Sequence, residues 1–275
     1  MAFSVNTNAG AFAALQNLNN TNSQIKTVQT QINTGLKVSS AKDDAATFAI
    51  AQKLRADVSG LNAVKSSLDR ATSTVDVAIA AGEAVSDLLI ELKEKAVAAK
   101  DSGLDTASRN SLNNDFAQLR SQITSIVDNA EFNGTNVVKS GGAAVIAITN
   151  DTGGNKISIA TQDLSVGGTN VTLSAGNTIS TATGASAAVT AIESSISNVN
   201  DALSALGSGA KRIELQRGFV DKLSDAIEVG VGNLVDADLA KTSANLQSLQ
   251  VKQQLGLQAL SIANQAPGTV LSLFR

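Results

Sequence analysis

The chain has 275 residues and a formal net charge of −3, and it contains no Cys, His, Trp or Tyr, one Pro and one Met. Without Cys and His, the sequence excludes disulfides, soft metal sites, thiol nucleophiles and imidazole general bases. Hydrophobic residues make up 43% of the chain and are mostly small aliphatic residues, so we expect a helix-rich structural protein with no metal or cofactor.

Charge is distributed unevenly, because all the acidic residues lie between positions 43 and 238. Residues 1–42 and 239–275 each carry three basic residues, no acid, and many Asn and Gln residues. Desolvating an amide costs less than desolvating a charge, so these ends suit contact with another protein, and flexible tails are the alternative. The small net charge and the scattered basic residues argue against nucleic-acid binding.

The first helical pattern is a partial heptad repeat near the start of the chain. It consists of Leu15, Leu18, Ile25, Ile32 and Leu36, with Asn22 and Gln29 on the same face. The adjacent acids Asp43 and Asp44 follow, and they point about 100° apart on a helix, so they do not form a carboxylate pair around one substrate atom. They are better suited to cap the next helix.

That next helix carries the most regular pattern in the chain, a nonpolar residue at alternating steps of four and three. The series is Val64, Leu68, Ala71, Val75, Ala78, Gly82, Val85, Leu89, Leu92 and Ala96. It predicts a long heptad face that ends near Gly103. A second helix, capped by Asp105 or Thr106 and apolar at Leu112, Phe116, Leu119, Ile123 and Ile126, is expected to run antiparallel to it.

Residues 140–183 are rich in Ser, Thr and Gly and predict a β region instead of a helix. Asn133-Gly134 predicts a turn, residues 145–149 and 156–159 a hairpin, and residues 171–173 a further strand. Helical spacing returns from Val189 to Leu234, and we interpret residues 207–211, with their two glycines, as a kink.

The last forty residues carry a second partial heptad at Leu239, Leu246, Leu249 and Leu260. Val251, Leu255 and Ile262 lie on another face, and a helix that is apolar on two faces needs more than one partner. We therefore expect the two ends to pair with each other and then with other copies; an ordinary intramolecular bundle is the alternative that spacing leaves open.

Sequence signals for other locations and for catalysis are weak. No apolar run is long enough for a transmembrane helix, and residues 1–8 do not have the pattern of a cleaved secretory signal. The Gly pairs do not match a phosphate-binding loop. No residue set in the chain supports an enzyme.

Three segments resemble bacterial flagellin. They are Gly35-Leu-Lys-Val-Ser-Ser-Ala-Lys-Asp-Asp-Ala-Ala46, Glu131-Phe-Asn-Gly134, and the tail from Ala263 to Arg275. The resemblance covers residues 1–140 and 185–275, and the short centre is similar to the compact flagellins of alphaproteobacteria.

The resemblance implies a mainly α fold of long antiparallel helices in a coiled-coil bundle, with a small central β-hairpin region. Residues 1–43 and 236–275 would form an inner coiled-coil polymerisation domain. Residues 44–235 would form an outer helical domain, with helices at about 44–100, 105–129 and 186–235 and a β region at about 134–183. Lys42, Asp43 and Asp44 would connect the two domains.

The resemblance also implies a function and partners. The chain would polymerise into the flagellar filament, the propeller for swimming, after export without a cleaved signal peptide. Its partners would be other copies, the export apparatus, an export chaperone, and the hook-associated and cap proteins, without nucleic acid or membrane insertion. The segment that an innate immune receptor recognises in many flagellins is degenerate here, with Glu91, Lys95 and Ala98.

Two other functions compete with the filament subunit. A hook–filament junction protein would share the same ends but would not propagate the polymer. A coiled-coil binding module would remain a monomer or dimer. Polymerisation into long filaments separates both alternatives from a filament subunit.

Overall fold

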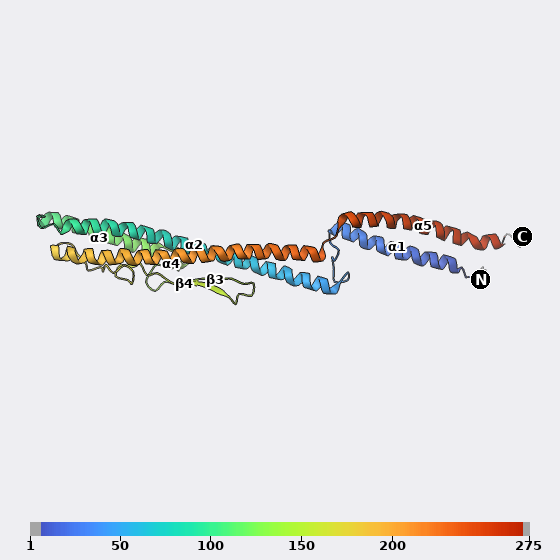
Figure 1. Cartoon of the computed structure of the whole chain (residues 1–275), viewed down its shortest axis with the longest axis horizontal. Helices are drawn as coiled ribbons and strands as arrows, with labels where there is room; N and C mark the ends of the chain where they lie inside the picture. The colour runs from blue at the N-terminus through green and yellow to red at the C-terminus, as the bar shows by residue number, and fades with distance from the viewer. Residues whose placement is uncertain (1–6, 272–275) are drawn as a thin grey trace. The chain divides into compact units, whose positions relative to one another are not determined.

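The computed structural model describes residues 7–271, with side chains up to residue 265. These residues form the helices α1 (Ala9–Thr34), α2 (Ala45–Ala99), α3 (Thr106–Asn129), α4 (Ala182–Val235) and α5 (Leu239–Leu271) (Figure 1). Strands β1 (Glu131–Phe132) and β2 (Thr135–Asn136) form one antiparallel pair, and β3 (Val145–Ile148) and β4 (Lys156–Ile159) form another. This confirms the prediction of a mainly helical fold with a small central β-hairpin region.

The chain divides into two compact units. One unit combines residues 1–56 with residues 226–275, and we call it the terminal unit. The other, residues 57–225, is the central unit. Each unit is described by itself below.

The central unit is built on α2, with α3 and α4 packed against it. Two ion pairs join α2 to α4: Lys65 Nζ lies 2.9 Å from Asp221 Oδ1, and Lys93 Nζ lies 3.0 Å from Glu193 Oε1. The later residue of α2 pairs with the earlier residue of α4. The two helices are therefore antiparallel. All ten residues of the heptad face from Val64 to Ala96 are buried, as the sequence predicted.

Glycines allow close approach between elements of the central unit. A Cβ atom at Gly82 would lie 2.7 Å from Leu203 Cδ2, and one at Gly209 would lie 2.7 Å from Ile159 Cδ1. Residues 207–211, where the sequence predicts a kink, lie within the single helix α4. Gly209 makes room there for the Ile159 side chain of β4.

The predicted ends of the helices agree with the structure to within a few residues. Asp105 is the N-cap of α3, and its side chain accepts a hydrogen bond from the Ser108 amide at 2.6 Å. The helix α2 ends at Ala99, so Gly103 lies in the following turn and does not itself end the helix. The helix α4 begins at Ala182, earlier than the expected residue 186.

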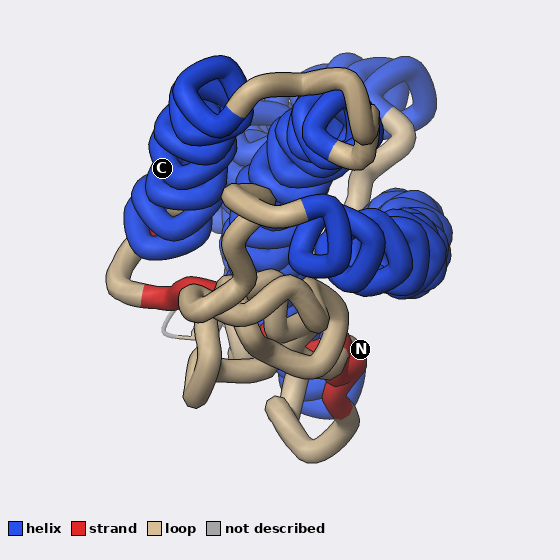
Figure 2. Tube along the Cα trace, turned by 90° about the vertical axis from the view of Figure 1, so that its left-hand side faces the viewer, coloured by secondary structure: helices blue, strands red, loops and turns tan. Residues whose placement is uncertain are grey.

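The irregular segment between α3 and α4 gathers on one side of the helices (Figure 2). The turn at Asn133 and Gly134 is confirmed; both residues have positive φ angles, 49° and 78°, as a tight hairpin requires. The hairpin of residues 145–149 and 156–159 is also confirmed. The strand expected at residues 171–173 is wrong: Val171 and Leu173 are buried, but this segment is held by Thr172, whose amide donates to Ser195 Oγ on α4.

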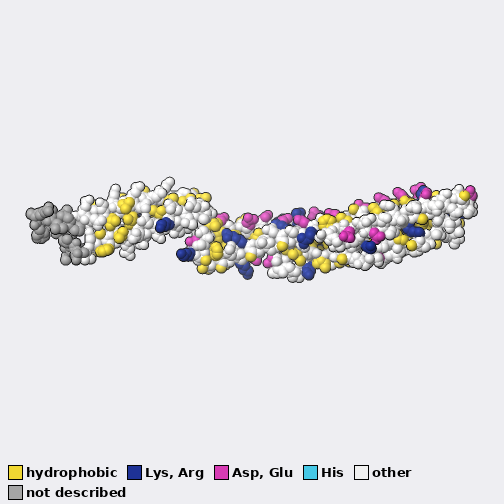
Figure 3. All heavy atoms as spheres, turned by 180° about the vertical axis from the view of Figure 1, so that it is seen from behind, with side chains coloured by type: hydrophobic (Ala, Val, Ile, Leu, Met, Phe, Trp, Pro, Cys, Tyr) yellow, Lys and Arg dark blue, Asp and Glu magenta, His cyan; other side chains and the backbone are white. Residues whose placement is uncertain are grey.

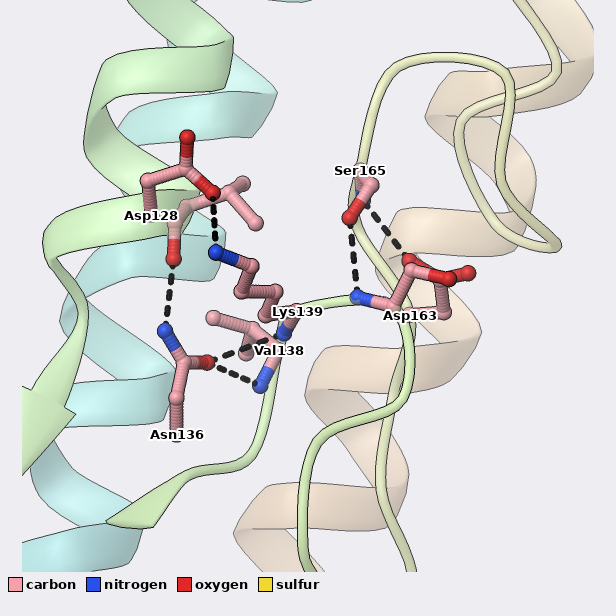
Figure 4. Close-up of polar contacts among 8 residues, drawn as sticks. Asp128, Asn136, Val138, Lys139, Asp163 and Ser165 are labelled. Carbon is pink, nitrogen blue, oxygen red and sulfur yellow. Dashed lines mark hydrogen bonds and ion pairs between the residues drawn. The ribbon is translucent and has the colours of Figure 1, made fainter. Parts of the chain in front are cut away.

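Polar side chains hold the start of this segment against α3 (Figure 4). The Asn136 side chain donates to the Val127 carbonyl at 2.7 Å and accepts from the Val138 and Lys139 amides at 2.9 Å. Lys139 Nζ forms an ion pair with Asp128 Oδ1 at 2.9 Å. Further along, Ser165 Oγ accepts from the Ser140 amide at 2.9 Å. These contacts anchor the loops without a continuous sheet.

Candidate functional site

The terminal unit contains the helix pair of α1 and α5, which run antiparallel to each other (Figure 1). Asn8 caps α1, because its Oδ1 accepts a hydrogen bond from the Ala11 amide at 3.0 Å. Its Nδ2 donates to the Ala263 carbonyl of α5 at 2.6 Å, so the same side chain also joins the two helices. At the other end of α1, Gly35 takes the left-handed C-cap position with φ 72°.

The core between α1 and α5 is small. Ile25, Val28 and Leu249 are buried, and Ile32 and Leu246 pack against them. Nearer the start of α1, Leu18 is also buried and lies over Gly256, where an added Cβ would be 3.4 Å from Leu18 Cδ1. The pairing of the two chain ends that the heptad patterns predicted is therefore present.

The predicted seam residues divide into those inside this core and those outside it. Leu18, Ile25, Ile32, Leu246 and Leu249 line the α1–α5 interface, with Leu260 half-buried. Leu15 is 43% exposed, and Leu239, the first residue of α5, is 49% exposed. Leu36 packs in a different cluster, described below.

Sequence reasoning missed Val28, which is 6% exposed, and placed Gln29 on the seam, although Gln29 is exposed. Val28 follows Ile25 by three residues and precedes Ile32 by four, so the step-of-three rule would have found it. The seven-residue spacing from Leu15 through Asn22 predicts Gln29 at this position, one residue after the side chain that is buried.

Apolar side chains also cover the outer face of α5, away from α1. Val251, Leu255 and Ile262 share this face and are all more than half exposed, and Leu257, also more than half exposed, lies on another side of the helix. The face of α1 and α5 that Figure 3 shows has hydrophobic and uncharged polar side chains with very few charged groups. Large exposed apolar patches without charge are typical of surfaces that bind another protein.

A short connection closes the base of the helix pair. Leu36 forms an antiparallel bridge with Asp236, and the amides of Lys37 and Val38 both donate to the Val235 carbonyl, at 2.6 and 3.2 Å. A second buried cluster lies at this point, formed by Val38, Ala51, Val231 and Val235 with Leu36, Phe48, Leu54, Ile227 and Leu234 packed around it. The connection therefore has its own hydrophobic core.

The two acids of the connection have separate structural tasks. Asp44 Oδ1 accepts from the amides of Ala46 and Thr47, at 3.0 and 3.1 Å, and so caps α2 as the sequence predicted. Asp43 Oδ2 accepts from the amides of Ser39 and Ser40, at 3.0 and 2.9 Å, and from both hydroxyls.

These hydrogen bonds favour the ionised carboxylates. The Ser39 hydroxyl and then the Ser40 amide lower the pKa of Asp43 below its ordinary value. The pKa of Asp44 is lowered mainly by the Thr47 hydroxyl and amide. Lys42, the remaining residue of the predicted connection, is exposed.

The segment with Glu91, Lys95 and Ala98 lies in the last part of α2. Glu91 and Ala98 are exposed, whereas Lys95 is half-buried and its Nζ lies 3.3 Å from Asp115 Oδ2 on α3. In residues 7–271, no group of three or more acidic side chains converges as a metal site, and no helix could span a bilayer.

Comparison with known proteins covers nearly the whole chain. The family model for the bacterial flagellin N-terminal helical region matches residues 5–141, and the model for the C-terminal helical region matches residues 189–274. Flagellin FljK of Caulobacter vibrioides is 47% identical over 272 residues, which are 99% of this chain and 98% of that protein. A flagellin of Brucella melitensis is 33% identical, with 99% of each chain covered.

A putative flagellar hook-associated protein from Vibrio parahaemolyticus has a similar fold. The TM-score is 0.58 at 14% identity, and the similarity covers 70% of this chain and all of that one. At this identity the similarity concerns the fold alone. The family models and the full-length relatives together show that the chain belongs to the bacterial flagellins, the structural subunits that polymerise into the flagellar filament.

Proposed function

We propose that copies of this chain polymerise through the outer faces of α1 and α5. The observation that carries this proposal is the row of exposed apolar residues on α5, in helices that contain no acidic residue. One face of α5 is used by α1, with Leu249 at its centre, and the other is left to solvent within a single chain. Covering it with other copies would remove apolar surface from water at little cost in charge desolvation.

The seam residues have two roles in this proposal. Leu18, Ile25, Ile32, Leu246, Leu249 and Leu260 hold α1 and α5 together and so shape the polymerising surface. Leu15 and Leu239 stay partly exposed in the single chain and would be covered by a neighbouring copy.

The proposed inner domain comprises residues 1–43 and 236–275, and the outer domain comprises residues 44–235 with a β region at about 134–183. The boundary lies within a few residues of the change in charge, because every acidic residue lies between positions 43 and 238. Lys42, Asp43 and Asp44 would connect the two domains. The carboxylates of Asp43 and Asp44 would stabilise that connection through the serine loop and the α2 N-cap.

Export is also part of the proposal. The chain would pass unfolded through the flagellar secretion channel without a cleaved signal peptide, with a chaperone holding the C-terminal segment until export. A sequence without Cys needs no oxidative folding step on either side of a membrane. Contacts with hook-associated and cap proteins would use the same terminal helices. The first six residues and the last four, which belong to these predictions, lie outside the described residues.

Weak recognition by the innate immune receptor is a separate part of the proposal. The receptor segment would present Glu91, an ion-paired Lys95 and Ala98. Lys95 is already engaged with Asp115, so the segment would offer the receptor an acid and a methyl group.

A pair of matched variants tests the proposed surface. Leu255 on α5 and Ile146 on β3 are each 58% exposed, so Leu255→Asp and Ile146→Asp add the same charge at the same exposure. We expect Leu255→Asp to keep the helical content of the chain but form no long filaments by electron microscopy, and Ile146→Asp to form them normally. Long filaments from Leu255→Asp would overturn the proposal, and short unextended assemblies from the parent chain would favour a junction protein.

A further inference from the structure

A hydrogen bond between two side chains lies within the interface of α1 and α5, between apolar residues. Gln253 Nε2 donates a hydrogen bond to Asn22 Oδ1 at 2.7 Å, and both side chains are half-buried. On one side of this pair Leu18 lies over Gly256, and on the other Ile25 and Leu249 are buried together. The two amides thus form a polar layer between two apolar layers.

The apolar contacts alone do not distinguish every alternative alignment of the two helices. Aliphatic side chains recur at heptad spacing along part of both helices, so a slip by seven residues in one direction would still place Leu18 against Leu249 and Ile32 near Leu239. A polar layer is different, because a half-buried amide that loses its partner keeps the cost of its desolvation.

A slip by one heptad in either direction separates Asn22 from Gln253. In one direction Asn22 would face Leu260, and in the other it would face Leu246 while Gln253 would face Leu15. Each slipped alignment therefore leaves at least one amide against a leucine. Only the observed alignment pairs these two amides with each other.

We propose that the Asn22–Gln253 pair is a register lock, a pair of positioning residues that selects one alignment of α1 and α5. Polar residues at single interface positions can select the register of a coiled coil at some cost in stability. The lock determines which apolar residues of α5 stand beside which residues of α1 on the outer surface. The inference rests on the observed pairing of the helices and not on the polymerising surface proposed above.

The absence of Cys from the chain allows a direct test by disulfide cross-linking of the full-length protein. A Cβ added at Gly256 would lie 3.9 Å from Leu18 Cβ, and one added at Gly10 would lie 4.0 Å from Ala263 Cβ; both separations suit a disulfide. Leu18→Cys/Gly256→Cys and Gly10→Cys/Ala263→Cys therefore report the observed alignment. Exchanging the partners, as Leu18→Cys/Ala263→Cys and Gly10→Cys/Gly256→Cys, reports slips by one heptad in the two directions.

The four reporters are oxidised in the parent chain, in Asn22→Leu/Gln253→Leu, and in the control Asn19→Leu/Gln254→Leu, whose two positions are exposed. Each is measured before and after polymerisation. In the parent and the control we expect the observed-alignment products to exceed the exchanged products by about tenfold or more, the ratio set by one unpaired amide. In Asn22→Leu/Gln253→Leu we expect exchanged products comparable to the observed-alignment products.

Several results would overturn the register lock. If Asn22→Leu/Gln253→Leu still gives only the observed-alignment products, other contacts, such as the bridge between Leu36 and Asp236 at the base of the pair, set the register and the amides do not. Equal amounts of both kinds of product in the parent, or no observed-alignment product there, would also contradict the inference. If the leucine variant does not fold, the test is repeated with Asn22→Ala/Gln253→Ala, because alanine is the strongest helix former.

Discussion

The two units of this flagellin have similar heptad patterns, but they bury their apolar residues to different extents. In the central unit, Leu68, Leu89 and Leu92 are fully buried, and ion pairs such as Arg217 to Asp69, at 2.7 Å, join α2 and α4 across the surface. In the terminal unit, α1 and α5 share a thin core, carry no acidic residue, and leave a row of apolar side chains exposed.

The difference teaches how one pattern can serve both a folded domain and a polymer. A helix bundle that buries its apolar faces within one chain needs no partner. A pair of helices that buries only one face of α5 leaves apolar surface exposed, and we propose that other chains cover it. We expect perturbations of the terminal helices to affect assembly first and perturbations of the central unit to affect folding first.

The largest expected effect comes from a charge in the terminal core. Leu249 is 3% exposed between α1 and α5, so Leu249→Asp would bury a carboxylate among the apolar side chains of Ile25 and Val28. We expect the variant to form no filaments and to lose part of its helical circular dichroism, while residues 57–225 resist proteolysis. Leu249→Met, similar in volume, should assemble.

Filaments formed by Leu249→Asp would contradict the expectation that assembly depends on the pairing of α1 with α5. The result also differs from that expected for Leu255→Asp, which should lose filaments without losing helical content. The two variants together therefore distinguish the pairing of α1 with α5 from the contact between copies.

A smaller effect is expected at two neighbouring glycines of α4. In Gly209→Ala the new Cβ would lie 2.7 Å from Ile159 Cδ1 and 3.0 Å from Cγ1. We expect overpacking to lower the free energy of unfolding by about 1–3 kcal/mol in urea titrations. The open position beside it is the control: nothing lies within 4 Å of a Cβ at Gly207, so Gly207→Ala should raise stability by about 0.5–1 kcal/mol. Equal effects at both sites would refute the close-packing role of Gly209.

A pH-dependent effect is expected at the connection. The pKa of Asp44 is lowered in the folded chain, chiefly by the Thr47 hydroxyl, so its contribution to stability is present above the ordinary carboxyl pKa. It is lost as the pH falls through the lowered value. We expect Asp44→Ala to be less stable than the parent at pH 7, with a difference that shrinks in acid, when thermal unfolding is followed across this range.

The matched control for this prediction is Asp87→Ala, at an exposed position within α2 and far from its N-cap. Its difference from the parent should not follow the same course with pH. If Asp44→Ala and Asp87→Ala behave alike, the cap does not contribute as inferred.

The smallest effect is expected at the ion pair between α2 and α3. The Nζ of Lys95 lies 3.3 Å from Asp115, and the two side chains are about a third and more than half exposed. We expect Lys95→Ala to lower the free energy of unfolding by about 1 kcal/mol at most, less at high salt. Filament formation should be unchanged. A larger loss, or a loss of filaments, would show that central surface charges matter to assembly.

Much of the fold followed from local patterns. The ten-residue heptad face of α2 is buried throughout, Asp44 and Asp105 cap their helices, and the hairpin of β3 and β4 lies where alternation and Gly pairs placed it. These features depend on residues near one another in the chain, so spacing and capping rules are sufficient to predict them.

Other features depend on contacts that spacing does not report. Val171 and Leu173 alternate like a strand, but the segment is held on α4 by Thr172, whose amide donates to Ser195 Oγ and whose hydroxyl donates to the Ala191 carbonyl. Glycine weakens a helix locally, but at Gly209 the missing side chain leaves room for Ile159 to pack against α4. In both cases a distant residue decides the outcome.

The sequence alone determined that both ends lack acidic residues and carry apolar residues at helical spacing. This pattern indicates two helices that pair with each other and have apolar surface left for further partners. Only the tertiary structure decided which residues of α1 and α5 meet. Asn22 and Gln253 are separated by 231 positions, and the sequence around either residue does not predict that it contacts the other. The physical reason is that periodicity specifies a face of a helix, whereas register depends on which side chains lose water together across the interface.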